Sequence, residues 1–488
     1  MTGPLLVVPA RDLATAPEPF FEALRARLSA GERAVALYGQ PARDPGDATL
    51  TAVLQGAAGL SVLRTTLTRE PGFRSLTPDF PALHVFEREL FEQLGVRPLG
   101  HPWLKPVRFP AAKPGDVASY PFYPIDGKVV HEVAVGPIHA GVIEPGHFRF
   151  MCLGEVVHHL EIQLGYQHRG AEPLLLGRDP RRLAPLVETI AGDSSVAHAW
   201  AWASAVEALA GLEADPAREA SRALGLELER IGMHLAGLSG LANDVAFLQG
   251  SATYGRLRTT AINTSMRLCG SRFGRGWVRA GGAPAGWDAE RAGIVRAALD
   301  LVARDVAIMN ERFLRSLSVQ HRLQGVGVLS REQAAGIGLV GQAARASGLA
   351  IDGRVDLPDG PYRATPVERV TEEAGDCWAR GVVRIREIDE SIRWLRALLD
   401  AWPVAAPAPT PVGALRPEAL AVSVREGWRG EVVHCIETDA AGRPCAYKVQ
   451  DPSLRNWMGL ALAVRGNEIS DFPICNKSFD LSYCGNDL

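Results

Sequence analysis

The sequence is poor in paired cysteines and in clustered positive charge. Its seven cysteines are scattered over 488 residues and form no C-x-x-C pair, which argues against a disulfide framework and against a self-contained zinc or iron–sulfur site. No Lys/Arg block stands out, and the formal net charge is only −3. The sequence therefore gives no indication of nucleic acid binding.

Long apolar runs are also missing. The opening stretch MTGPLLVVPARD lacks the cationic region and the apolar run of a signal peptide. No later stretch offers the roughly 20 uninterrupted apolar residues of a membrane span. We therefore expect a cytoplasmic chain, and its length predicts two or three domains.

The N-terminal part mixes helical and strand-like patterns. EPFFEALRARLSAGE and FPALHVFERELFEQLG have helical spacing of apolar residues, whereas TLTAVLQGA is strand-like. These patterns predict a small α+β domain over residues 1–110. Six prolines between His101 and Gly127 then predict a linker at 111–130.

The remainder, residues 131–488, is mainly helical in pattern. Apolar residues recur three and four apart in the segments 155–167, 198–213, 217–249, 331–349 and 386–402. A Pro/Ala-rich stretch predicts an internal linker at 402–416. Two strand-like runs joined by an Asp/Gly-containing turn predict a β-hairpin at 431–451.

Four stretches together carry a family resemblance. They are residues 76–102, residues 136–172 with GPIHAGVIEPGH and GYQHRGAE, residues 226–282 with LELERIGMH and RFGRGWVRAGG, and the final DFPICNKSFDLSYCGNDL. In this order they resemble the large subunit of energy-converting [NiFe] hydrogenases of the hydrogenase-4 and formate hydrogenlyase type, and the homologous quinone-site subunit of respiratory complex I (NADH-quinone oxidoreductase). The N-terminal part resembles the 30-kDa complex I subunit, which is often fused ahead of the quinone-site subunit. The resemblance implies an α+β class, with a hydrogenase large-subunit-like domain that is mainly helical and carries small β-hairpins.

In the hydrogenase branch, two cysteine pairs hold nickel and iron as thiolates. In this sequence the first pair falls on Ala191 and Ser194, and the second pair falls on Ser482 and Gly485. None of these side chains can supply a thiolate. The resemblance therefore implies a member of the group that has no NiFe centre of its own.

In the complex I branch, a histidine on a β-hairpin turn and a nearby tyrosine bind the quinone headgroup. His139 matches the first histidine of that turn, but the usual headgroup histidine falls on Ile143 and the tyrosine falls on Gly192. His147 and Tyr483 are the candidates to replace them. The alternative for both histidines is a solvated position in a Gly/Pro-rich turn.

Three further polar residues belong to the candidate site. Asp193 and His198 are candidate catalytic residues in the expected cavity, and Glu144 is a candidate proton relay between two histidines. The alternatives are an N-cap role for Asp193, a satisfied core position for His198, and a turn carboxylate for Glu144.

The stretch LELERIGMH places four ionisable groups on one helix. The i,i+3 and i,i+4 spacing of Glu227 and Glu229 with Arg230 and His234 predicts helix–helix salt bridges. Glu229 and His234 are also candidates for a proton path. Trp200 and Trp202 are expected to pack in the core.

His168 and Arg169 are expected to face the [4Fe–4S] cluster of a partner subunit, because the matching residues do so in the family. Positive charge there would raise the potential of the cluster. The alternative is a solvated helix end, where cations meet the C-terminal dipole.

The leading hypothesis is a subunit of a membrane-attached oxidoreductase complex, peripheral to the inner face of the cell membrane. It would dock an iron–sulfur small subunit and antiporter-like membrane subunits, and couple electron transfer to proton or ion movement, with quinone as the candidate acceptor. Two alternatives stay open: a non-catalytic scaffold that transmits conformational change, and a true [NiFe] hydrogenase.

Overall fold

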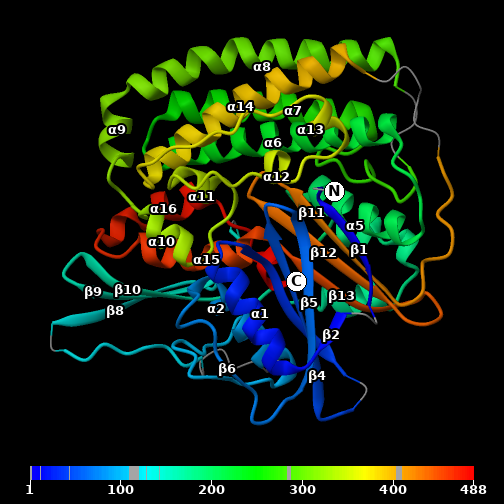
Figure 1. The fold of residues 1–488 in the computed structure, drawn as a ribbon. Helices are drawn as coiled ribbons and strands as arrows, with labels where there is room; N and C mark the ends of the chain where they lie inside the picture. Colours follow the sequence, from blue (N-terminus) through cyan, green and yellow to red (C-terminus); the bar gives the residue numbers. More distant parts are fainter. Residues whose placement is uncertain are drawn as a thin grey trace.

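The computed structural model describes residues 3–10, 13–42, 44–108, 120–127, 129–141, 143–282, 287–402 and 409–488. Long helices cover one side of a central sheet, and a smaller unit with its own sheet lies on the other side (Figure 1). The predicted α+β class is confirmed. The predicted linkers at 111–130 and 402–416 lie partly outside the described residues.

The N-terminal unit is a four-stranded sheet of order β2-β5-β4-β3, flanked by α1 and α2. Phe20 and Leu24 of α1 pack with Phe86 and Leu90 of α2 in one core cluster, because both helices place apolar residues on a single face. A short parallel pair, β6 with β7, completes the unit. The bounds are β2 Ala14–Thr15, α1 Pro17–Ser29, β3 Arg33–Pro41, β4 Asp47–Gly56, β5 Gly59–Thr68, β6 Phe73–Arg74, η2 Pro81–Leu83, α2 His84–Leu94 and β7 Pro98–Leu99.

The central sheet has the order β1-β11-β12-β13 and is antiparallel throughout. Every residue of β11 and β12 is buried, because both faces of the sheet are covered. Alternate residues such as Val422 and Val433 pack against the N-terminal sheet, whereas Ala421 and Ile436 belong to the core that contains α5. The predicted hairpin at 431–451 is confirmed. The bounds are β1 Leu5–Pro9, β11 Ala419–Glu426, β12 Glu431–Thr438 and β13 Pro444–Gln450.

The helical layer is built around α6, which contacts α7, α14 and α16. Asp215 begins α6 by accepting a hydrogen bond from the backbone N–H of Arg218, with Pro216 at the first helical position. Trp200 and Trp202 of α5 are buried in the core as predicted. The bounds are α3 Ala171–Leu176, η4 Pro180–Arg182, α4 Ala184–Val187, α5 Ser195–Leu209, α6 Pro216–Asp244, α7 Leu248–Cys269, α8 Ala289–Arg315, α9 Leu317–Leu323, α10 Arg331–Gly336, α11 Gly341–Ala346, α12 Gly353–Asp356, α13 Gly360–Ala364, α14 Cys377–Asp400, α15 Pro452–Ala463, η5 Ile469–Asp471, α16 Phe472–Phe479 and α17 Tyr483–Asp487.

A three-stranded ribbon, β10-β9-β8, projects from the body (Figure 1). Its strands are β8 Val130–Val135, β9 His147–Leu153 and β10 Val156–Gln163. The predicted helix at 155–167 is therefore wrong. A β-bulge between Val157 and His159 inserts one residue, so that buried Val157 and Leu160 lie three apart and imitate helical spacing. His168 and Arg169 consequently follow a strand, and their interpretation as a helix end is also wrong.

Candidate functional site

The loop before α5 carries Ala191 and Ser194, the first pair of positions that the resemblance matches to metal ligands; these and Ser482 and Gly485 are called the former ligand positions below. Ala191 is fully buried, and Ser194 immediately precedes the first residue of the helix. The hydroxyl of Ser195 donates hydrogen bonds to the carbonyl oxygens of Glu188 and Gly192, each at 3.2 Å. The loop is thus closed by its own backbone and by small side chains.

Asp193 does not cap α5, so the N-cap interpretation is wrong. Its two carboxylate oxygens accept hydrogen bonds from both terminal nitrogens of Arg429, each at 2.6 Å. The first turn of α5 is capped instead by Glu229 of α6, which accepts from the backbone N–H of Val196 at 2.8 Å and of Ala197 at 3.3 Å. The bidentate ion pair with a guanidinium is the stronger interaction, because it is charge-assisted.

The second pair of positions begins the short helix α17. The hydroxyl of Ser482 accepts a hydrogen bond from the backbone N–H of Gly485 at 2.9 Å. A Cβ atom added at Gly485 would lie 2.6 Å from Cγ of Asp451. The space that a side chain would need at this position is therefore occupied by a carboxylate.

Arg169 joins the loop before α5 to the start of α17 through hydrogen bonds. Its terminal nitrogens donate to the carbonyl oxygens of Thr189 at 2.7 Å, Ile190 at 3.2 Å and Cys484 at 3.4 Å. Nδ1 of His168 lies 2.7 Å from the carbonyl oxygen of Asp487. Both side chains are exposed, so they form part of the surface while holding the former ligand segments together.

His198 is the centre of a buried hydrogen-bonded chain. Its Nε2 lies 3.1 Å from Oδ2 of Asp451, and its Nδ1 lies 3.1 Å from Nε2 of His434. Nδ1 of His434 lies 2.8 Å from the hydroxyl of Tyr447. All four side chains are buried. Groups that both donate and accept, joined in this way, can pass a proton along their length.

The two ends of this hydrogen-bonded chain differ in charge. Burial, together with the nearby His198, holds the pKa of His434 well below its ordinary value, so His434 is neutral. Burial opposes ionisation of Asp451, but the hydrogen bond from His198 and the charge of Arg429 outweigh it and lower the pKa of Asp451. This hydrogen-bonded chain of side chains thus runs from the carboxylate of Asp451, beside Gly485, to the neutral imidazole of His434 and the phenol of Tyr447 in the central sheet.

Glu229 lies beside a cavity of about 10 Å³ that Asp193, Ser265 and Arg272 also line. Burial raises the pKa of Glu229 to about 8, against the opposing effect of the two backbone N–H groups, and the charge of Asp193 raises it further. The cavity is about the size of one water molecule. The carboxyl can therefore exchange a proton near neutral pH next to the first former ligand pair.

Glu227, Arg230 and His234 of α6 belong to a buried ionic network. Nε of Arg230 lies 3.1 Å from Oε2 of Glu227, which is one of the predicted pairings, whereas Glu229 binds backbone N–H groups instead. His234 donates from Nε2 to Glu387 at 2.7 Å. Burial lowers the pKa of His234 to about 4 even though Glu387 raises it. His234 is therefore neutral and serves in packing α6 against α14.

The turn between β8 and β9 contacts the segment around Tyr483 through Glu144. Nε2 of His139 lies 2.9 Å from the carbonyl oxygen of Gly146, and Nδ1 of His147 lies 3.2 Å from that of Gly136. Both imidazoles thus bond to the backbone of their own turn. Glu144 instead accepts a hydrogen bond from the backbone N–H of Tyr483 at 3.3 Å, which ties the hairpin to the second former ligand segment.

Comparisons with known proteins show the family of this chain. The family described as "Respiratory-chain NADH dehydrogenase, 49 Kd subunit" matches residues 244–414, and the corresponding 30 Kd subunit matches residues 23–122. An NADH-quinone oxidoreductase subunit of Dehalococcoides mccartyi is 31% identical over 71% of this chain and 95% of its own length. The chain belongs to the 49 Kd subunit family.

The predicted similarity to hydrogenase-4 subunits is confirmed by a curated relative, and a solved structure shares the fold. Hydrogenase-4 component G of Escherichia coli is 28% identical over 85% of this chain and 76% of its own length. A chain of the archaeal membrane-bound sulfane sulfur reductase, a respiratory membrane complex, shares the fold with a TM-score of 0.70 at 23% identity, over 75% of this chain and all of that one. Within the described residues, no helix of this 49 Kd family member has the length and apolar character needed to cross a bilayer.

The donor set of this 49 Kd family member does not fit a nickel–iron centre. Its four former ligand positions offer two hydroxyls and no sulfur, and the described His, Cys, Asp and Glu residues form no group that could hold a metal ion. Sγ of Cys484 lies 3.4 Å from the hydroxyl of Ser482, but Cys475 lies 4.0 Å from Cys377 in a separate buried pair. All seven cysteines are free.

Sequence reasoning missed three residues of the site in this 49 Kd family chain. His434 and Tyr447 lie on the strands of the predicted hairpin, and Asp451, its last residue, is the N-cap of α15. Asp451 could have been found, because an Asp-Pro pair at the start of a helical pattern predicts a cap. The meeting of these residues with His198 depends on the sheet packing against α5, which no local pattern reveals.

Proposed function

We propose that this 49 Kd family member is the proton-handling subunit of a membrane-attached oxidoreductase complex of the hydrogenase-4 and complex I type, without a NiFe centre of its own. The buried chain from Asp451 through His198 and His434 to Tyr447 carries this proposal. It begins against Gly485, one of the former ligand positions. The former ligand positions offer no thiolate for a metal, whereas the side chains of this hydrogen-bonded chain can transfer protons.

Electrons enter through the [4Fe–4S] cluster of an iron–sulfur small subunit that docks over His168 and Arg169. Both side chains are exposed, and Arg169 is fixed by three carbonyl oxygens. A fixed positive charge beside a cluster stabilises its reduced form and raises its potential. This surface is therefore suited to a partner that carries negative charge on reduction.

The membrane attachment is proposed from the relatives, whose names include membrane-bound hydrogenase and NADH-quinone oxidoreductase subunits. In this proposal the chain is peripheral to the inner face of the cell membrane and meets antiporter-like subunits there. In this proposal the 30 Kd-like unit spans residues 1–110 apart from β1, which pairs with β11 in the sheet of the 49 Kd-like unit at residues 131–488. Quinone is the candidate acceptor, with His139, His147 and Tyr483 as the candidate ligands of its headgroup.

The test is purification of the intact complex from membranes through a tag on this chain. We expect an iron–sulfur subunit to accompany it, with iron present and nickel far below one atom per complex. Arg169→Gln should lower the midpoint potential of the cluster in a redox titration followed by electron paramagnetic resonance. Arg312→Gln, an exposed arginine on α8, is the matched control. Isolation of the chain without an iron–sulfur partner contradicts the proposal.

The proton role has its own test. His198→Ala and Asp451→Asn should slow proton uptake more than electron entry into the complex, whereas the exposed His321→Ala on α9 should change neither. Quinone reduction and proton uptake that survive these changes, and also survive His139→Ala with Asp193→Ala, favour a scaffold that only transmits conformational change. The scaffold function is kept as a second candidate because both hairpin histidines hydrogen-bond to the backbone of their own turn.

A further inference from the structure

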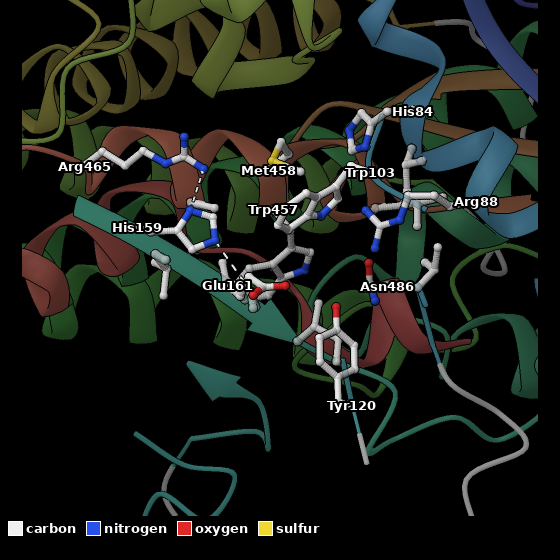
Figure 2. Close-up of a pocket in the computed structure, with 17 residues that line it drawn as sticks. His84, Arg88, Trp103, Tyr120, His159, Glu161, Trp457, Met458, Arg465 and Asn486 are labelled. Carbon is white, nitrogen blue, oxygen red and sulfur yellow. Dashed lines mark hydrogen bonds and ion pairs between the residues drawn. The ribbon is translucent and has the colours of Figure 1, made fainter. Parts of the chain in front are cut away.

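A separate pocket lies where the N-terminal unit meets the 49 Kd-like unit (Figure 2). It has a volume of about 120 Å³ and is lined by residues of α2, β10 and α15 together with Trp103, Tyr120 and Asn486. These elements are far apart in the sequence. The pocket exists only because α2 packs beside α15, and none of the sequence patterns indicates it.

Polar atoms of four residues that line this pocket are not hydrogen-bonded within the described part of the chain. Nε2 of His159 and Oε1 of Glu161 belong to the ion-pair contacts of Glu161, whereas the ring nitrogens of His84 and Nε1 of Trp457 have no such contact. His84 and Trp457 are only 7% and 5% exposed, and a buried donor without a partner costs about 1 to 3 kcal/mol. Burial lowers the pKa of His84 to about 3, so its neutral ring has one N–H. A ligand with a hydrogen-bond acceptor would satisfy that N–H and the indole N–H of Trp457.

The pocket carries more positive than negative charge. Two guanidinium groups, those of Arg88 and Arg465, line it with one carboxylate, that of Glu161, and the charges of Glu161 and Glu92 act on Arg88. Arg88 donates from Nε and Nη2 to the carbonyl oxygens of Lys105 and Pro106 at 2.7 and 2.6 Å, and Arg465 bonds to Nδ1 of His159 at 3.2 Å. Among the described residues, neither guanidinium forms an ion pair. Glu161, the acidic residue that lines the pocket, is paired with Lys105 at 3.3 Å.

The walls of the pocket are aromatic and apolar. Trp103, Tyr120 and Trp457 line it together with Met458, and Figure 2 shows the tryptophan rings between the two arginines. A closed cavity of about 150 Å³ with apolar walls holds benzene. This pocket has about 120 Å³ but is partly open to solvent, so a one-ring body fits with part of it toward the opening. Aromatic walls favour a planar or branched apolar group over an extended polar one.

We infer that this pocket binds a small organic carboxylate with a one-ring or branched apolar body. The carboxylate lies toward Arg88 and accepts hydrogen bonds from the indole N–H of Trp457 and the ring of His84. The apolar body packs against Trp103 and Tyr120. Carboxylate and guanidinium form charge-assisted hydrogen bonds, which are about twice as strong as neutral ones. The site is independent of the proposed proton chain.

The test is isothermal titration calorimetry of the full chain with benzoate as the probe. Saturable binding is expected, and benzyl alcohol, which has the same ring without the charge, should bind about tenfold more weakly or worse. Arg88→Gln should weaken benzoate binding to the same extent, whereas Arg312→Gln should leave it unchanged. Benzylamine, a cation, should not bind.

A second variant guards against misfolding of Arg88→Gln, since Arg88 also bonds to the backbone. Trp457→Phe keeps an aromatic ring and removes only the donor, so benzoate binding should weaken while the melting temperature stays close to that of the wild type. Absence of saturable benzoate binding up to about 10 mM overturns the inference, and so does equal affinity for benzyl alcohol. Either result would mean that the pocket holds only water or is an empty apolar cavity.

Discussion

Gly485 offers the sharpest test of how the space around the positions matched to metal ligands is filled. Substitution by Ala adds one methyl group, whose carbon would lie 2.6, 2.8 and 2.9 Å from Cγ and the two oxygens of Asp451. Contacts below 3.0 Å force a shift, and Asp451 is held by His198 at 3.1 Å and by the backbone N–H of Ser453 at 2.8 Å. The carboxylate therefore has to leave at least one partner.

The expected loss is about 2 to 4 kcal/mol. Overpacking a filled core costs about 1 to 3 kcal/mol, and loss of a hydrogen bond to a charged group costs about 1.5 to 3 kcal/mol. The two costs overlap, because a carboxylate that moves away relieves the clash. Gly485→Cys, the change that would restore a ligand position, should cost at least as much as Gly485→Ala.

The assay is the urea midpoint of the full chain, with Gly293→Ala as the matched control. Gly293 is also helical and has no atom within 4 Å of an added Cβ, so alanine should stabilise it by up to about 1 kcal/mol. In an Asp451→Ala background, Gly485→Ala should cost much less, and this double-mutant cycle measures the coupling. A Gly485→Ala protein as stable as the wild type would refute the reasoning.

Three further outcomes follow from the site. Glu229 has a pKa of about 8 instead of 4.5, so its contribution to stability is fully present below about pH 4.5 and is lost as the pH rises toward 8. Glu229→Gln should therefore gain in urea midpoint relative to the wild type across that window, and parallel profiles contradict this. Tyr447→Phe should cost about 0.5 to 1.5 kcal/mol in thermal unfolding, because His434 loses its partner, whereas exposed Tyr123→Phe should cost nothing measurable. Arg169→Gln should speed amide hydrogen exchange in residues 482–488 by about tenfold or more, and unchanged exchange there rules out the proposed tie.

The sequence predicted local structure well where one periodicity acts alone. The apolar spacing of α5, α6 and α14 predicted helices that the structure contains, and the turn between β12 and β13 predicted their hairpin. It failed at β10, because a bulge displaced the two-residue alternation by one position. The division into two domains stays a prediction.

The site was predictable only in part. The loss of thiolates could be read from Ala191, Ser194, Ser482 and Gly485, because it needs only the residue types. The partner of Asp193 could not be predicted, since Arg429 lies 236 positions away in the sequence. Hydrogen bonds across such separations depend on the packing of the whole fold. The roles proposed for His139, His147, Asp193, His168 and Arg169 therefore stay predictions that the experiments above test.

The pairing of β1 with β11 affects how this protein can be divided. Residues 5–9 pair with residues 419–423, so the chain contributes an edge strand to the large unit before it builds the small one. A truncated polypeptide that starts after residue 10 leaves the edge of β11 unpaired, and such an edge invites association with other chains. Separating the two units into independent polypeptides should therefore succeed only when residues 5–9 are supplied to the large unit, for example by circular permutation.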